Sequence, residues 1–278
     1  MKTLILNSSN VVPSSNNSKY KLNLSNANFV SGDKIAIHSI QIPYSWFNIS
    51  DYYSNNKFQY KFNGVVYDIL LYNQFLTIDD INLILKENLI MNGHYLVDSN
   101  GENWYPMNLS YNTARYCVQF DSFLIPPTLP TNYTNPGNVF YNTAIAPFNI
   151  FQLIIPSSNI TKIFGFNAGI YPSSNQTSRY AKLSDFIPNG SEVNSILVKC
   201  NLCSNDYSGT SDLIYSFPIG NTSFGTNIEK TSYEFAWIDI RAGSKNDITI
   251  EFCDQNYKPI YINDPNVCIQ LLIKNKDE

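Results

Sequence analysis

Charged side chains are scarce in this sequence. Asp, Glu, Lys and Arg together make up 14% of its 278 residues, where an ordinary soluble domain carries about a quarter. Its polar character comes mainly from Asn, Ser and Thr. Neutral groups lose little hydration energy when a neighbouring chain covers them, so this composition suits a protein that packs against others. An AT-rich genome would favour the same residues, and the two explanations are compatible.

Basic clusters and long apolar runs are also missing. The formal net charge is −4 and no run of Lys and Arg occurs, whereas a nucleic-acid-binding domain usually presents a basic stripe. We therefore expect no direct binding to nucleic acid. No apolar run approaches the roughly 18 residues that cross a bilayer, so we expect no membrane span. The apolar stretch that ends at Leu6 is too short for a signal-peptide core, so no such signal is expected.

The sequence contains only five cysteines, and the odd number favours a reduced compartment over a disulfide scaffold. They are Cys117, Cys200, Cys203, Cys253 and Cys268. Cys200 and Cys203 form a Cys-x-x-Cys pair, but residues 195–202 have a strand pattern. Side chains three positions apart on a strand point to opposite faces. With no second such pair nearby, we expect buried structural thiols and neither a zinc nor a redox site.

Residues for enzyme catalysis are few. The two histidines are His38, in the middle of an expected strand, and His94, just after an expected helix, where a solvated or helix-dipole-facing role is ordinary. No Gly-x-Ser-x-Gly element is present. Asp79 and Asp80 open the helix, where carboxylates oppose the helix dipole favourably. An enzyme with a jelly-roll fold is therefore a weak alternative, and we expect no catalytic residue.

Metal and sugar sites have little support. The acidic residues of the last third lie along expected strands without metal-loop spacing: Glu229, Glu234, Asp239, Asp247, Glu251 and Asp254. A calcium loop at residues 263–264 has no positive signal. The aromatic stretches at residues 44–47 and 52–53 could stack sugars, but in a β-rich fold they more often pack in cores and interfaces. We predict no metal and no cofactor.

Strand patterns dominate the chain. Residues 34–42 alternate with period two and end at Pro43. Asn63-Gly64, between residues 57–62 and 65–70, predicts a two-residue hairpin because both positions accept positive φ. Further strands are expected from residue 150 onward: 150–155, 195–202, 212–217, 233–240, 247–253 and 267–273. No internal repeat is evident, which favours a sandwich or jelly roll over a propeller or solenoid.

One helix interrupts this pattern. Thr77 is a suitable N-cap with Asp80 at the third helical position, and Gly93 follows Asn92 where a C-cap glycine is wanted. Residues 1–18 are expected to form a flexible N-terminal arm. Prolines through residues 121–149 predict an irregular insertion. The sequence thus predicts a single domain from residue 19 to residue 278.

Several stretches carry a family resemblance. In chain order they are Phe29–Ile49, which ends in a Tyr-Ser-x-x-Asn-Ile element, Asn55–Phe58, Thr77–Asn82, Lys162–Phe166, Ile248–Gln255, Pro259-Ile260 and Val267–Ile273. Together they resemble the penton (minor capsid) proteins of virophages, polintons and polinton-like viruses. The similar stretches run in the same order from about residue 20 to the C-terminus.

This resemblance implies one jelly roll of two stacked four-stranded sheets. It also implies a structural, non-enzymatic role as a homopentamer at the icosahedral vertices of a virus particle, beside a hexon-like major capsid protein. Assembly would take place inside the host cell, with the arm as a tether. The alternative is a β-sandwich head that binds a receptor or a carbohydrate, which would share the fold class and the aromatic content.

Overall fold

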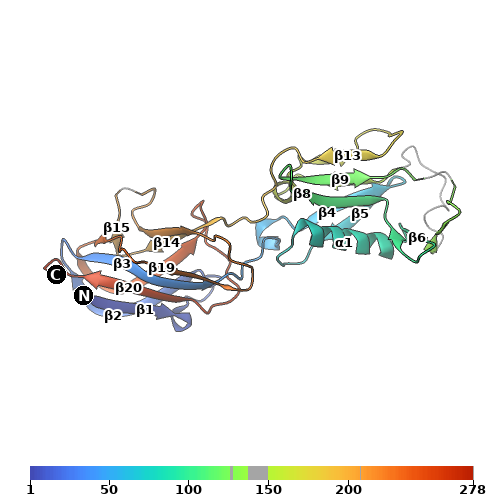
Figure 1. The fold of residues 1–278 in the computed structure, drawn as a ribbon. Coiled ribbons are helices and arrows are strands. Elements are labelled where there is room, and N and C mark those ends of the chain that lie inside the picture. Colours follow the sequence, from blue (N-terminus) through green and yellow to red (C-terminus); the bar gives the residue numbers. More distant parts are fainter. Residues whose placement is uncertain (126–127, 137–149, 207, 278) are drawn as a thin grey trace. The chain divides into compact units, whose positions relative to one another are not determined.

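The chain forms two compact units in a computed structural model that describes residues 1–125, 128–136, 150–206 and 208–277 (Figure 1). Unit 1 comprises Met1–Trp46 and Glu192–Glu278, and unit 2 comprises Phe47–Ser191. The chain therefore leaves the first unit, builds the second, and returns to complete the first. No helix in these ranges is long and apolar enough to span a membrane.

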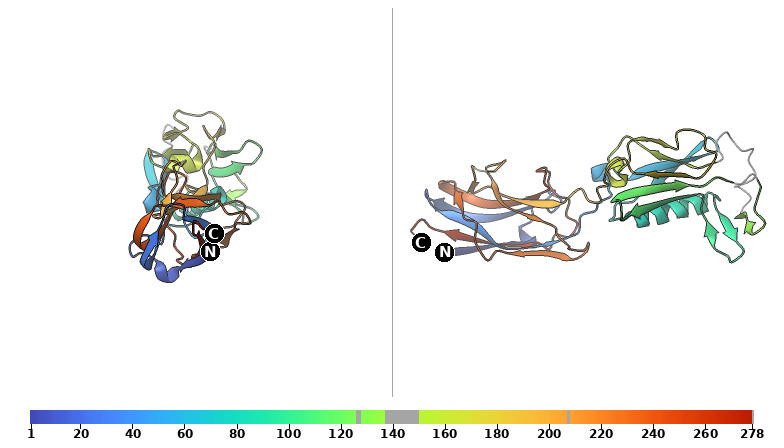
Figure 2. Two further views of the ribbon diagram at one scale, coloured as in Figure 1. Left: turned by 90° about the vertical axis from the view of Figure 1, so that its left-hand side faces the viewer. Right: turned by 45° about the horizontal axis from the view of Figure 1, so that its top comes forward.

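Unit 1 contains two antiparallel sheets that lie face to face (Figures 1 and 2). The first has the order β1 (Lys2–Asn7), β20 (Cys268–Lys274), β3 (Lys34–Pro43), β18 (Ile238–Ile240) and β15 (Cys203–Ser204), and β17 (Asn227–Thr231) also pairs with β3. The second has the order β16 (Leu213–Pro218), β14 (Ser195–Cys200), β19 (Gly243–Cys253) and β2 (Lys19–Phe29). Apolar side chains that alternate along these strands form the core, because successive residues point to opposite faces.

The N-terminal residues differ from the expected flexible arm. Strand β1 pairs with β20 over six residues, from Lys2 opposite Ile273 to Asn7 opposite Cys268. Leu6 is fully buried in this arrangement. The partner strand lies at the other end of the sequence, so no local pattern could show that residues 2–7 would be ordered by pairing with it.

The described residues of unit 2 form three sheets and two helices. The largest sheet has the order β12 (Gly169–Tyr171), β11 (Gln152–Ile155), β4 (Lys57–Phe62) and β5 (Val65–Leu70). A second has the order β13 (Tyr180–Leu183), β9 (Cys117–Ser122) and β8 (Met107–Asn112), and a small third has the order β10 (Tyr133–Thr134), β6 (Leu96–Asp98) and β7 (Asn103–Trp104). The helices are α1 (Ile78–Met91) and α2 (Ile160–Phe164), and short 3-10 turns occur at Ser8–Asn10 in unit 1 and Asp51–Tyr53 in unit 2.

The predicted helix and hairpin are confirmed. Helix α1 begins after Thr77, whose hydroxyl accepts from the Asp80 N–H while the Asp80 carboxylate accepts from the Thr77 N–H. It buries Ile81, Leu85 and Leu89 against the core of unit 2. The β4–β5 turn at Asn63-Gly64 has φ values of 49° and 80°, as a two-residue hairpin of this type requires.

The all-β prediction is confirmed, but the domain boundaries differ. In place of one domain with two four-stranded sheets, the described residues form five sheets in two units. Residues 47–191 are compact by themselves because they bury their own apolar cluster, including Phe58, Phe151 and Phe164. Of the irregular insertion expected at 121–149, residues 121–122 belong to β9 and 133–134 form β10. Residues 126–127 and 137–149 lie outside the described part.

Candidate functional site

His94 lies in the core of unit 2. Its side chain is 1% exposed, and its Nδ1 is 3.0 Å from the Tyr60 hydroxyl oxygen. The rings of Phe62, Tyr67 and Phe151 pack around it at centroid distances of 5.1, 4.9 and 5.4 Å. Burial lowers the pKa of His94 to about 4, so the ring is neutral at pH 7. The expectation of a solvated role was wrong, because aromatic rings of the core enclose the imidazole.

His38 lies in the middle of strand β3, as predicted. It is half-buried, and its ring lies 5.7 Å from the ring of Phe235, centroid to centroid. The two histidines belong to different units, since His38 lies in unit 1 and His94 in unit 2.

Cys200 and Cys203 are brought together in unit 1. Cys200 ends β14, a turn at residues 201–202 follows, and Cys203 begins β15 in the other sheet. Both side chains are buried, and the hydrogen bond that the Cys203 thiol shares with Cys200, together with this burial, raises the pKa of Cys203. The expected divergence of the two side chains was wrong, because the strand geometry ends at Cys200. Within the described ranges, no group of three or more Cys, His, Asp or Glu residues could hold a metal ion.

Several of the acidic residues singled out in the sequence have structural partners, among them Asp80, Asp247 and Glu251. The Asp80 carboxylate accepts from the Thr77 N–H at 2.8 Å and from its hydroxyl at 2.7 Å, and these hydrogen bonds lower the pKa of Asp80. On β19, Asp247 and Glu251 form ion pairs at 3.0 and 3.3 Å with lysines of the neighbouring strand β2. These carboxylates cap a helix and join strands, which is a structural use of charge.

The aromatic stretch before unit 2 packs inside the protein. Trp46 is 1% exposed, and its ring lies 4.6 Å from that of Tyr44. Phe224 meets Tyr44 edge-on at 5.7 Å. The core-packing interpretation of Tyr44 and Trp46 is thereby confirmed. Tyr52 and Tyr53 also pack edge-on, at 5.1 Å, with Tyr52 partly exposed.

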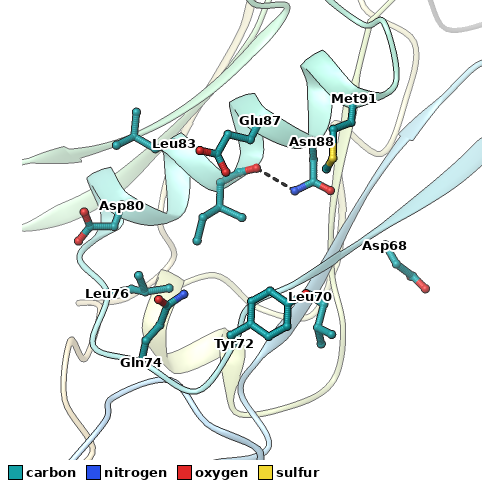
Figure 3. A pocket seen from close by; sticks show the side chains of 11 residues that line it. Asp68, Leu70, Tyr72, Gln74, Leu76, Asp80, Leu83, Glu87, Asn88 and Met91 are labelled. Atoms are coloured by element: carbon teal, nitrogen blue, oxygen red, sulfur yellow. Dashed lines mark hydrogen bonds between the residues drawn. The ribbon is translucent and has the colours of Figure 1, made fainter. Parts of the chain in front are cut away.

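A groove in unit 2 combines exposed apolar side chains with a free strand edge. It lies between strand β5 with the residues that follow it and one face of helix α1, and its volume is about 600 Å³ (Figure 3). Leu70 and Tyr72 on one side are 53% and 75% exposed, and Leu83 and Met91 on the helix are 57% and 74% exposed. Apolar side chains gathered in this way usually mark an interaction surface. We call this feature the β5–α1 groove.

Comparisons with known proteins find resemblance only at the level of structure. No family model and no curated protein matches the sequence. The chain is similar to the mavirus penton protein, with a TM-score of 0.45 and 9% identity over 99% of this chain and 98% of that one. It is also similar to a chain of the Sputnik virophage structure, with a TM-score of 0.39 and 13% identity over 100% and 99% of the two chains. At these scores and identities the similarities do not assign a family.

Asn48 is a structural residue that the sequence did not single out for a role. Its Nδ2 donates to the carbonyl oxygens of Leu76 and Gly190, and its Oδ1 accepts from the Leu76 N–H, all at 2.8 Å. Asn48 lies where the chain enters unit 2, and Gly190 lies just before the chain leaves it. The side chain therefore ties the two ends of the inserted unit together. The one local signal was the Tyr-Ser-x-x-Asn-Ile element, which contains it.

Thiol reactivity tests the placement of the cysteines. Cys268 is exposed, while the other four are buried, and burial raises the pKa of Cys253 to about 11. Because only an accessible thiolate reacts readily, we expect DTNB to label one thiol per folded chain at pH 8 and five in guanidinium chloride. Cys268→Ser should abolish the native signal. Rapid labelling of Cys200 or Cys203 in the folded protein would contradict their buried positions.

Proposed function

We propose that this chain is a structural capsid protein that forms homopentameric pentons at the icosahedral vertices of a virus or virophage particle. It acts without catalysis, by covering surface on its neighbours. Its partners are four further copies of itself and a hexon-like major capsid protein, and its place is the virion. The observation that carries the proposal is the strand order of unit 1. The sequence resemblance implies a jelly roll, and the strand order supports the same fold independently of that resemblance.

The strand order supports a single jelly roll. One sheet contains β1, β20 and β3 followed by β17 and β18, and the other contains β2, β19, β14 and β16. Consecutive strands mostly alternate between the sheets, and the first strand pairs with the last, as the wrapping of two Greek keys requires. Strand β15 is an addition, and β17 and β18 share one position beside β3. The inserted unit 2 then occupies a single connection of the jelly roll, between β3 and β14.

The chemistry of the surface agrees with permanent contacts between chains. Large apolar side chains are exposed in both units, for example Ile5 in unit 1 and Leu83 in unit 2. Five copies related by a fixed rotation make head-to-tail contacts that close into a ring. Permanent interfaces of this kind bury about 2,000 Å² or more. A surface with few charges reduces the desolvation cost of such contacts.

Particle assembly tests this proposal. The chain is co-expressed with its major capsid protein, and the particles are imaged by cryo-electron microscopy with and without it. We expect density for five copies at each vertex, and open vertices when the chain is omitted. Particles with closed vertices in its absence would contradict the proposal. Saturable glycan binding by a monomer that never enters particles would instead favour the receptor- or carbohydrate-binding head.

A further inference from the structure

Cys200 and Cys203 are placed for a disulfide. Residues 201–202 form a turn between the end of β14 and the start of β15. The first and fourth residues of a β-turn have Cα atoms less than about 7 Å apart, and disulfides join Cα atoms that are roughly 4.4–6.8 Å apart. The two thiols share a hydrogen bond, so their side chains point toward each other. The expectation of no redox site depended on diverging side chains, and this contact removes its basis.

Backbone hydrogen bonds hold the turn between the two sheets of unit 1. The Asn201 side-chain oxygen accepts from the Thr249 N–H at 2.8 Å, and the Asn201 N–H donates to the Thr249 carbonyl oxygen at 3.2 Å. The carbonyl oxygen of Leu202, whose side chain is fully buried, accepts from the Arg241 N–H at 2.9 Å. The two cysteines that flank this turn are therefore held in place by the fold itself, before any bond joins their sulfur atoms.

Strand β15 is a short edge strand. It lies at the end of its sheet, and its ladder with β18 consists of Cys203 opposite Ile240 and Ser204 opposite Asp239. Short edge segments open locally at a lower free energy than core strands do. Such opening gives an oxidant access to thiols that are buried in the closed protein.

We propose that Cys200 and Cys203 form an intrachain disulfide when the folded protein meets a small-molecule disulfide oxidant such as oxidised glutathione. The disulfide joins β14 of one sheet to β15 of the other, and it thereby fastens the edge strand to the rest of unit 1. The pair is a redox-controlled fastening of this edge. This inference does not depend on the capsid role.

The disulfide forms by two thiol–disulfide exchanges. The thiolate of one cysteine attacks a sulfur atom of oxidised glutathione, which forms a mixed disulfide and releases one glutathione thiolate. The thiolate of the other cysteine then attacks the protein sulfur of the mixed disulfide, closes the Cys200–Cys203 bond and releases the second glutathione. The protein loses two electrons and two protons, and one oxidised glutathione becomes two reduced ones.

The surroundings of the pair make this closure slow and its product durable. The hydrogen bond with Cys200, together with burial, raises the pKa of the Cys203 thiol, so little of it is thiolate at neutral pH. Oxidation therefore takes longer than labelling of the exposed Cys268. A dithiol that is not stabilised as a thiolate gives a disulfide that is harder to reduce.

The test uses the full-length protein with Cys268→Ser, which removes the exposed thiol. The folded protein is incubated with excess oxidised glutathione at mildly alkaline pH, then denatured, alkylated, digested with trypsin and analysed by mass spectrometry. We expect the tryptic peptide 200–230, which contains both cysteines, to lose two hydrogens and to escape alkylation. Cys117 and Cys253 are the matched controls, because they are also buried, and they should remain alkylated as free thiols.

A second measurement compares the folded and unfolded chains. We expect the equilibrium constant for disulfide formation to be at least tenfold larger in the folded protein than in protein unfolded in urea, because folding holds the two sulfur atoms together. By linkage, a tenfold ratio raises the free energy of unfolding of the oxidised protein by about 1.4 kcal/mol. Cys200→Ser and Cys203→Ser, each combined with Cys268→Ser, should lose this oxidant-dependent gain. Hydrogen exchange at residues 203–204 should slow on oxidation only in the protein that keeps both thiols.

Three outcomes would overturn the inference. The first is a peptide 200–230 that keeps both free thiols after the folded protein has been held in excess oxidised glutathione. The second is a disulfide that forms only after unfolding, or one that lowers the free energy of unfolding. The third is attachment of glutathione to Cys117 or Cys253 as fast as this pair is oxidised, because local opening of β15 would then not be what exposes the thiols.

Discussion

Acidification from pH 7 to pH 5 should destabilise unit 2 by about 2 kcal/mol through His94 alone. Burial lowers the pKa of this group to about 4 in the folded protein, whereas a solvated histidine has a pKa of about 6.5. Between these values the unfolded chain binds a proton that the folded chain does not, so stability rises with pH there. The contribution is therefore lost progressively as the pH falls from above 6.5 toward 4. At pH 5 most carboxylates remain ionised, which isolates the histidine.

Urea unfolding at pH 7 and pH 5 measures this effect, and hydrogen exchange of peptides from residues 58–62 and 89–96 locates it in unit 2. His94→Gln removes the titrating group, so the difference between the two pH values should largely vanish in that variant. Tyr60→Phe is the matched control, because it removes the hydrogen bond at Nδ1 and leaves the titration in place. An unchanged pH dependence in His94→Gln would show that the ring is not buried in its neutral form.

Asn48→Ala should destabilise unit 2 by about 3 kcal/mol. The substitution leaves the carbonyl oxygens of Leu76 and Gly190 and the Leu76 N–H without the partners they have now. Asn48 is 2% exposed, so water replaces those hydrogen bonds only if the site opens. We also expect faster hydrogen exchange around residues 74–77 and 188–191.

Asn73→Ala is the control for that experiment. Asn73 is exposed in the connection between β5 and α1, which also contains Leu76, and its Oδ1 accepts a hydrogen bond of 2.9 Å from the Asp51 N–H. Its loss should cost less than about 1 kcal/mol. Equal effects of the two substitutions on the free energy of unfolding would contradict the stabilising role of the Asn48 hydrogen bonds to Leu76 and Gly190.

The elements that the sequence predicted well are encoded locally. The start of α1 depends on Thr77 and Asp80, three residues apart, and the β4–β5 hairpin depends on Asn63 and Gly64. Each signal acts within a few residues, through a side-chain cap or a positive φ. Strand β3 was also predicted from a local pattern, because its apolar alternation ends at a proline.

The features that the sequence did not predict depend on distant parts of the chain. Strand β1 is ordered by β20, more than 250 residues away, so a short Asn- and Ser-rich terminus resembled a free arm. The division into two units depends on which apolar residues share a core, and strand patterns alone do not reveal that. The β5–α1 groove combines an edge position in a sheet with one helix face, and both emerge only after the strands are paired.

Cys200 and His94 show the same limit at single residues. The Cys200–Cys203 contact depends on where strand β14 stops, which is Cys200 and not residue 202 as the sequence pattern predicted. The burial of His94 depends on the direction that the chain takes after helix α1. That direction is set at Gly93, whose φ is 70°. Neither the end of strand β14 nor the path of the chain after Gly93 could be predicted from the neighbouring residues alone.

The most direct test of the proposed function is the mass of the purified chain in solution, by analytical ultracentrifugation over a range of concentrations and in the presence of the major capsid protein. The proposal predicts a discrete species of about 158 kDa, five times the 31.6 kDa of one chain, or the same five-fold stoichiometry once the major capsid protein is added. A chain that stays at 31.6 kDa under all of these conditions, or that forms a closed ring of another number, would contradict it.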